Sequence, residues 1–283
     1  QGGGPPTCWS NASSARSLSS MSADDPQASS DYEIYELIPL LLTDDERLLL
    51  TACREIAVRA AHSTPFTQHS LLEFSGVAPL VRLLRPDEML TTTVRTAACK
   101  AVARVAQCES PDGGRDLVRT VQDALAAAGA LELLAALLEV AEREPAKKSG
   151  VAISSLGRTE AKLFATKLAE QSALIEAACG AIACLCVCGD DAAGVNGGNQ
   201  QRVREAGVVP RLVTMLRDGT TYALRLAGLR TLSAVVGGGA EGRRAARDAA
   251  CFAPLVALLN AGIELGGRDD DEGDRSDGGG GGC

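Results

Sequence analysis

The pattern of hydrophobic and polar positions is clearest in residues 207–236, GVVPRLVTMLRDGTTYALRLAGLRTLSAVV. Leucine and valine recur there at the spacing of one helix face, in two runs that a polar break at Gly219 separates. Gly207 suits a corner with positive φ, and Pro210 suits the first turn of a helix, where a missing N–H costs nothing. The stretch therefore predicts two helices, the first of which begins near Val208.

Copies of this unit recur along the chain. Segments that resemble its proline-started helix begin, in order, at Glu36, Gly76, Gly129, Gly207 and Cys251. Two of the spacings, 40 and 44 residues, match helical repeat families, whereas the other two, 53 and 78 residues, require insertions. A helix pair with apolar faces cannot bury both faces alone, so we expect the copies to stack on one another.

The second helix of the unit also recurs, as segments rich in small residues that align without gaps. They are TACREIAVRA (51–60), TAACKAVARVA (96–106), EAACGAIACLC (176–186) and LAGLRTLSAVV (226–236). Short helical segments, such as RVREAG at 202–207, precede most of the glycine starts. The repeat is therefore predicted to hold a short first helix, a second helix with proline in its first turn, and a third helix of small residues.

With this organisation the chain resembles the armadillo repeat family. The likeness rests on LLEFSGVAPLVRLL (71–84), VREAGVVPRLVTMLRDG (203–219) and the AACKAVARVA type of third helix, and it covers about residues 36–263. The resemblance implies an all-α fold, a right-handed α-solenoid of about five three-helix armadillo repeats. HEAT repeats, which are two-helix units, are the nearest alternative.

Composition agrees with stacked helices. Hydrophobic residues make up 46% of the chain but aromatic residues only 3%, so the core is expected to consist of Leu, Ala and Val. Strands would draw on aromatic and β-branched residues instead. No apolar stretch of about 18 residues stands out, so no membrane span is expected.

The ends of the chain and two internal segments differ from the repeats. Residues 1–30 are rich in Gly, Ser and Pro, and residues 266–283 form an acidic, Gly-rich tail, so both are predicted to be disordered around a solenoid of residues 31–265. An insertion at 145–158 and a polar linker at 189–199 interrupt the repeats. Because the chain begins with glutamine rather than methionine, we interpret the sequence as a fragment.

Local signals predict two further helix ends. In the first repeat, Thr43 is the expected cap of a helix that opens with the acids Asp44, Asp45 and Glu46. In the third repeat, the second helix is expected to stop just before Pro145, because a residue that precedes proline is pushed out of the α region.

Charge limits the class of partner. The formal net charge is −8, and half of it comes from the tail RDDDEGDRSD at 268–277. Phosphate binding requires a basic footprint, so the overall charge argues against nucleic acid as the main partner. A local basic groove remains compatible with it.

The ten cysteines include a tight cluster, Cys179, Cys184, Cys186 and Cys188. On a helix, Cys184 and Cys188 share one face, and Cys179 and Cys186 share another. Four thiolates therefore cannot converge on a tetrahedral metal. We therefore expect small buried side chains in a reducing compartment, with no metal and no cofactor. Zinc binding or redox sensing is the alternative.

Signals of catalysis are absent from the sequence. The two histidines, His62 and His69, flank a loop between repeats, and no nucleophile elbow accompanies them. No phosphate-binding loop, dinucleotide fingerprint or carboxylate pair is visible. The chain is therefore not expected to be an enzyme.

The third helices carry the candidate binding site. In armadillo proteins they line a concave groove that holds extended peptides, and importin-like members carry Trp and Asn at two positions of each third helix. The Trp position aligns here with Arg54, Lys100, Gly180 and Arg230, and the Asn position with Val58, Arg104, Cys184 and Ala234. Because none of these aligned positions holds Trp or Asn, import of basic cargo is not expected.

Three of the four Trp positions are basic instead. Arg54, Lys100, Arg104 and Arg230 are therefore the candidate partner-binding residues of a groove for acidic or phosphorylated segments, which is similar to the catenin type of armadillo protein. The alternative is ordinary solvated helix charge. The resulting interpretation is a monomeric protein-interaction scaffold in the cytoplasm or nucleus, with a protein or peptide partner.

Two other functions stay open. The chain resembles the substrate-binding armadillo portion of plant-type U-box ubiquitin ligases, whose catalytic-partner domain would lie outside this sequence. A membrane-tethered armadillo protein would require an acylated N-terminus, which the sequence does not show.

Overall fold

The computed structural model describes residues 33–86, 89–107, 115–148, 158–187, 195–219, 221–237 and 239–266, all of which fall in one unit. These residues are helical apart from short connections and one isolated bridge between Val187 and Val195. The predicted disorder of residues 1–30 lies outside the described residues, as does that of residues 266–283 except for Gly266, which ends α13.

The helices group into the predicted repeats. The first repeat has two helices, α1 (Ile34–Leu40) and α2 (Glu46–His62). The second and third repeats have three each: α3 (Thr64–Glu73), α4 (Val77–Arg82) and α5 (Thr92–Val105), then α6 (Arg115–Ala127), α7 (Ala130–Lys148) and α8 (Arg158–Cys186). The fourth has α9 (Gly197–Glu205), α10 (Val208–Asp218) and α11 (Tyr222–Val236), and the fifth has α12 (Ala240–Asp248) and α13 (Phe252–Gly266).

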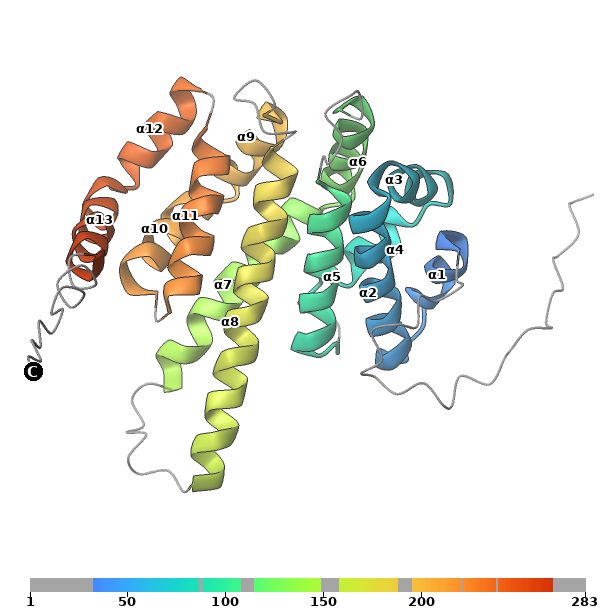
Figure 1. The fold of residues 1–283 in the computed structure, drawn as a ribbon, viewed down its shortest axis with the longest axis horizontal. Helices are drawn as coiled ribbons and strands as arrows, with labels where there is room; N and C mark the ends of the chain where they lie inside the picture. The colour runs from blue at the N-terminus through green and yellow to red at the C-terminus, as the bar shows by residue number, and fades with distance from the viewer. Residues whose placement is uncertain are drawn as a thin grey trace, which may run out of the picture. The chain divides into compact units, whose positions relative to one another are not determined.

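The third helices form the spine of this arrangement. Helices α2, α5, α8 and α11 each pack against the next in chain order, and Figure 1 shows them as a row. Each second helix packs on the third helix of its own repeat, as α10 does on α11. The prediction of an all-α solenoid of three-helix repeats is confirmed.

The corner between first and second helices follows the sequence signal. Gly207 has a φ of +71°, α10 begins at Val208, and Pro210 lies in its first turn, as predicted. Gly129 has a φ of +89° at the same corner of the third repeat. Ser75 and Ala250 have φ values of +56° and +55° at the other two corners, where a side chain makes this conformation less favourable than it is for glycine.

Two predictions about the first repeat are wrong. Pro39 lies in the last turn of α1 rather than the first, because the helix starts five residues earlier, where Glu33 and Glu36 form a capping box. Asp45, not Thr43, caps α2, and its carboxylate accepts from the backbone N–H of Arg47. The Thr43 hydroxyl instead donates to the carbonyl of Leu40 and closes the preceding turn.

Both predicted interruptions are shorter than expected. Helix α7 continues past Pro145 to Lys148. The proline costs the helix only one backbone hydrogen bond, and the Ala and Lys residues that follow are strong helix formers. Helix α9 begins at Gly197, inside the predicted 189–199 linker, because the side chain of Asn196 accepts from the N–H of Asn199 and caps it. Residues 149–157 and 188–194 lie outside the described part of the chain.

A buried glutamine in the first helix of the second, third and fourth repeats ties that helix to a third helix. The Nε2 atom of Gln68 donates to the carbonyl of Val105 at 2.7 Å, and that of Gln200 to the carbonyl of Ala234 at 2.6 Å. Gln122 donates to the carbonyls of Cys184 (2.7 Å) and Ala106 (3.1 Å). These amides satisfy carbonyl groups at the ends of α5, α8 and α11 that have no partner within the helix.

Helix α8 departs from one expectation of the sequence. Residues Thr159–Cys186 are long and apolar enough to cross a membrane by length and composition, with a mean hydropathy of 1.4 in the best window. The sequence was expected to hold no such stretch, so that expectation is wrong on composition. A third of this window is buried inside the protein, where α8 packs between α5 and α11.

Candidate functional site

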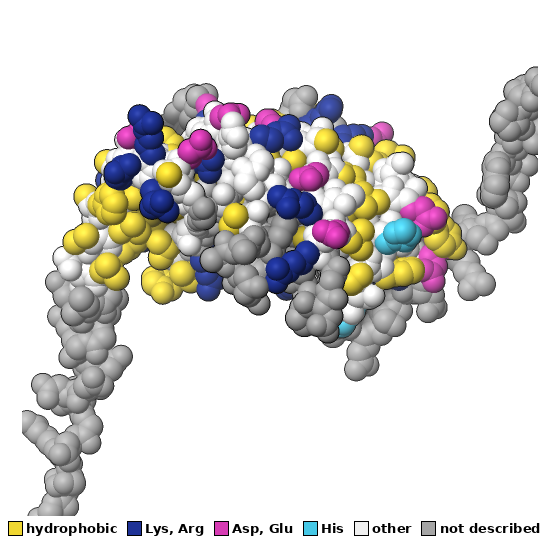
Figure 2. All heavy atoms as spheres, turned by 90° about the horizontal axis from the view of Figure 1, so that it is seen from above, with side chains coloured by type: hydrophobic (Ala, Val, Ile, Leu, Met, Phe, Trp, Pro, Cys, Tyr) yellow, Lys and Arg dark blue, Asp and Glu magenta, His cyan; other side chains and the backbone are white. Residues whose placement is uncertain are grey.

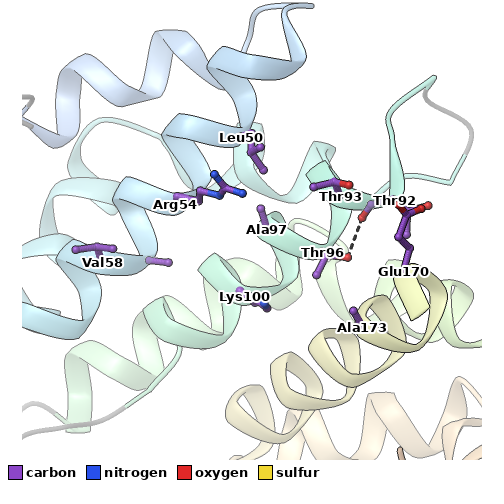
Figure 3. A pocket seen from close by; sticks show the side chains of 11 residues that line it. Leu50, Arg54, Val58, Thr92, Thr93, Thr96, Ala97, Lys100, Glu170 and Ala173 are labelled. Atoms are coloured by element: carbon purple, nitrogen blue, oxygen red, sulfur yellow. Dashed lines mark hydrogen bonds between the residues drawn. The ribbon is translucent and has the colours of Figure 1, made fainter. Parts of the chain in front are cut away.

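A cavity of about 500 Å³ opens across the third helices of the first three repeats. Its walls come from one face of α2, one face of α5 and the middle of α8 (Figure 3). The lining residues are Leu50, Arg54, Ala57, Val58, Thr92, Thr93, Thr96, Ala97, Lys100, Glu170 and Ala173. We refer to this cavity as the third-helix groove.

The helix period explains why these side chains share one surface. On α5, Thr93, Thr96, Ala97 and Lys100 follow at three- and four-residue steps, which place them on one face of the helix. The small side chains keep the groove open, and the hydroxyl of Thr96 is turned back to the carbonyl of Thr92 at 2.8 Å (Figure 3). The lining therefore combines a largely apolar surface with a few charged groups.

Two of the four predicted binding residues lie in this groove. Arg54 and Lys100 are exposed side chains from neighbouring third helices, and Figure 3 shows Arg54 extending from α2 towards α5. Neither forms an ion pair with another described residue. The groove therefore presents two cations that are available to a ligand.

The other two predicted residues do not line the cavity. Arg104 is exposed near the end of α5, where it donates to the side chain of Gln107 at 3.2 Å. Arg230 is exposed on α11, one repeat beyond the cavity. The structure thus brings together Arg54 and Lys100, whereas Arg104 lies one turn beyond Lys100 on α5 and Arg230 lies on α11.

Glu170 is a charged residue of the groove that the sequence analysis missed. It is exposed on α8 and lines the cavity together with the two cations. It lies six residues before the aligned copy of the third helix, in the part of α8 that is longer than in the other repeats. The length of the apolar run that ends at Cys186 could have shown that α8 begins this early.

Behind the groove, three cysteines fill the space between the third helices. Cys53, Cys99 and Cys179 are fully buried, and each directly precedes one of the aligned Trp positions. Burial raises the pKa of Cys53 and of Cys179 to about 12, and burial together with the two neighbouring thiols raises the pKa of Cys99 further. These thiols are therefore protonated and act as small apolar groups.

The cysteine cluster of residues 179–188 was predicted to bind no metal. Cys179 and Cys186 are buried, Cys184 is half-buried, and Cys188 lies outside the described residues. Burial raises the pKa of Cys184, which a hydrogen bond from Gln107 and the charge of Arg104 partly oppose. Within the described ranges, no group of three or more His, Cys, Asp or Glu side chains could hold a metal ion.

The two histidines lie away from the groove. Both are exposed, His62 at the end of α2 and His69 on α3. His69 is 3.7 Å from the carboxylate of Glu73 on the same helix. Neither histidine is among the residues that line the cavity.

Comparison of the fold with solved structures identifies it. A designed armadillo repeat protein in complex with the peptide (KR)4 matches with a TM-score of 0.57 at 23% identity, over 81% of this chain and 75% of its own. The fold is that of an armadillo-repeat protein. Two engineered proteins from the Northeast Structural Genomics Consortium match equally well, with TM-scores of 0.57 and 0.58 at 23% and 22% identity. These cover 81% of this chain, and the chain covers 72% and 74% of theirs.

No protein-family model and no curated protein sequence matches the chain. The armadillo assignment therefore rests on the fold, and the four third helices take the places that their alignment in the sequence predicted. The catenin-like and plant-type subtypes stay predictions.

Proposed function

We propose that the protein is a binding scaffold that holds an extended acidic or phosphorylated segment of a partner protein in the third-helix groove. The observation that carries the proposal is the pair of cations, Arg54 and Lys100, on the walls of an open cavity between neighbouring third helices. Neither cation has an acidic partner among the described residues, so an acidic ligand would supply one.

The lining also matches an extended peptide rather than a compact cofactor. The cavity crosses three helices, and its hydroxyl-bearing face on α5 can exchange hydrogen bonds with a peptide backbone. Apolar side chains such as Leu50 and Val58 would contact the aliphatic parts of the ligand. The armadillo fold supports this role, because a designed armadillo repeat protein of similar fold is in complex with a peptide.

The charge of the groove favours the opposite ligand from that of the designed protein. That protein is in complex with (KR)4, which is basic. Here two cations face one carboxylate, Glu170, across the cavity, so an anionic segment is favoured and a cationic one is repelled. A non-enzymatic role accords with this interpretation, since the groove holds a binding surface without a paired acid and base.

The free thiols support an intracellular location for this scaffold. Six cysteines of the described residues are free, and most of them are buried. A reducing compartment preserves such thiols, so we place the protein in the cytoplasm or nucleus.

The experiment compares two labelled octapeptides, (Asp-Glu)4 and (Lys-Arg)4, for binding to the full chain by fluorescence anisotropy. We expect the acidic peptide to bind, and to bind less tightly as salt is raised, because exposed charges are screened. The double variant Arg54→Glu, Lys100→Glu should weaken its binding by about tenfold or more, which corresponds to about 1.4 kcal/mol. Adding Arg104→Glu and Arg230→Glu tests whether the ligand extends along the row of third helices.

The matched control carries the same charge change outside the groove. Arg85 and Arg119 are exposed on the second repeat and on α6, so Arg85→Glu, Arg119→Glu changes the net charge by the same amount. Equal loss of binding in both double variants, or tighter binding of (Lys-Arg)4, would refute the proposal. Circular dichroism checks that each variant stays helical.

A further inference from the structure

The fifth repeat lacks a third helix among the described residues. Helices α12 and α13 correspond to the first and second helices of the other repeats, and α13 packs on α10 in the same way as α10 packs on α7. In the second, third and fourth repeats the second helix is covered by the third helix of the same repeat. No described residue therefore takes the place of such a helix at this end.

The open face of α13 is apolar. Phe252, Val256 and Leu259 are 61%, 53% and 67% exposed, and they follow at the four- and three-residue steps of one helix face. Figure 2 shows hydrophobic side chains gathered at this end of the molecule, over α12 and α13, next to lysine and arginine side chains.

The same positions are covered in the complete repeats. When α13 and α10 are aligned on their prolines, the three residues correspond to Val208, Leu212 and Met215. Val208 and Leu212 are buried, and Met215 lies against α11, since a Cβ atom on Gly228 would come within 2.8 Å of its Cε. In repeats 2 and 3 the equivalent positions, all buried, are Val77, Val81, Leu84, Ala130, Leu134 and Leu137.

Helix α11 has an open position at the same place. Leu229 aligns with the three cysteines that are buried between successive third helices, yet it is 38% exposed. Its position agrees with the leucine and valine period of residues 207–236, and among the described residues no third helix follows α11 to cover it. Leu229 and the α13 face thus belong to one surface that a further third helix would cover.

A charged residue marks where one end of that helix would lie. Gln68, Gln122 and Gln200 each lie seven residues before the positive-φ residue of their corner, and each donates to carbonyls at the end of a third helix. Arg243 lies seven residues before Ala250, the positive-φ residue of the fifth repeat. It is exposed, and its guanidinium forms no hydrogen bond or ion pair with another described residue.

We propose that α11, α12 and α13 form a docking surface for an amphipathic helix of a partner protein, which lies where the third helix of the fifth repeat would lie. Its apolar stripe covers Leu229, Val256 and Leu259, and its C-terminal end faces Arg243. The negative end of a helix dipole, or an acidic residue in the last turn, complements this arginine. The surface is separate from the third-helix groove and does not depend on the function proposed for it.

The chain's own tail does not have the composition of this helix. Residues 267–283, GRDDDEGDRSDGGGGGC, contain no Leu, Ile, Val, Met or aromatic residue, so they cannot supply an apolar stripe. Its glycines also make a helix unfavourable. The apolar face and Arg243 together fit an amphipathic helix with its C-terminal end at the arginine.

The test uses a third helix of the same architecture as its probe. A peptide of residues 221–237, which contains α11, is labelled at its N-terminus and left with a free C-terminal carboxylate, and its binding to the full chain is followed by fluorescence anisotropy. We expect saturable binding that the double variant Val256→Asp, Leu259→Asp weakens at least tenfold. The matched control is Leu42→Asp, because Leu42 is 58% exposed at the opposite end of the row of repeats. A scrambled peptide should not bind.

The role of Arg243 is tested by substitutions at Arg243 and at its neighbour Arg244. Arg243→Glu should weaken binding at least fivefold, whereas Arg243→Gln should retain most of it, because glutamine is the residue that the complete repeats use there. Arg244 is also exposed, so Arg244→Glu makes the same charge change one position away. Equal loss in the two Glu variants would show unspecific attraction and would overturn the proposed geometry.

Other outcomes also decide the matter. Absence of binding at millimolar peptide, or equal binding to wild type and to Val256→Asp, Leu259→Asp, would overturn the proposal. Self-association of the wild-type chain that the same variant abolishes, measured by sedimentation equilibrium, would assign the surface to a second copy instead of a partner. The groove variant Arg54→Glu, Lys100→Glu should bind this peptide normally, which separates this test from that of the groove.

Discussion

On α2 and α5, neighbouring residues face opposite environments. Cys53 and Cys99 are fully buried between helices, whereas Arg54 and Lys100, the next residues in the chain, line the open groove. The buried position keeps one small residue type in three repeats, because the helices pack closely there. The exposed position changes from Arg to Lys to Gly and back to Arg, so packing does not restrict it. Binding specificity can therefore change on one face while the stability of the fold is kept by the other.

The largest difference between the two faces is expected on adding a negative charge. Cys99→Asp places a carboxylate in a fully buried site, where the loss of hydration outweighs the attraction of Arg95, so we expect the free energy of unfolding to fall by more than about 4 kcal/mol, or the chain not to fold. Lys100→Asp, one position on, should change it by about 0.5 kcal/mol or less. Urea denaturation followed by circular dichroism measures both, and similar losses would mean that the two faces are not distinct.

Alkaline pH should lower the free energy of unfolding through the buried cysteines and not through the groove residues. The pKa of Cys53 is about 12 in the folded protein against an ordinary value of 9.0, so the unfolded chain loses this proton first. The free energy of unfolding is unaffected below pH 9 and falls above it, by about 1.4 kcal/mol per pH unit for each such thiol. Cys53→Ala should make the decline above pH 9 shallower by that amount. Parallel pH profiles for variant and wild type would contradict the assignment.

The smallest expected effect is on the groove face. Glu170→Lys removes the one carboxylate of the groove lining and adds a third cation, so the affinity for (Asp-Glu)4 should rise by about three- to tenfold, or about 1 kcal/mol. Because Glu170 is exposed, the unfolding midpoint should stay within error of wild type. As a control, Glu160→Lys changes an exposed carboxylate on the same helix outside the lining and should leave the affinity unchanged. Unchanged affinity in both variants would remove Glu170 from the site.

Much of the fold could be predicted because single residues mark its corners. Gly207 and Pro210 gave the correct start of α10, and the alignment of the third helices placed Arg54 and Lys100 side by side in advance. Pro39 led to a wrong prediction of the start of α1, because a proline is tolerated near either end of a helix. The capping residues before it indicate the start correctly. Ala250 gave no signal of its positive φ, since backbone hydrogen bonds from its own N–H to Arg247 and from Cys251 to Ala246 close this turn without a glycine.

The site was predictable only in part. Lys100 and Arg104 are one turn apart on α5, and the alignment of the third helices does not show which of the two lines the cavity. The buried glutamines could have been found, because Gln122 and Gln200 both lie seven residues before a corner glycine. Gln68 lies at the same distance from Ser75, where no glycine draws attention to the spacing.

Gln122 has a consequence for how the protein opens. Its side chain donates at once to the last carbonyls of α8 and to the carbonyl of Ala106 after α5, and its own oxygen accepts from Asn196 before α9. Opening either neighbouring repeat therefore breaks part of this buried hydrogen-bond network, which couples repeats that a solenoid would otherwise lose one by one. In native-state hydrogen exchange, the amides of α5 and α8 should exchange as one cooperative unit, slower than those of α12 and α13.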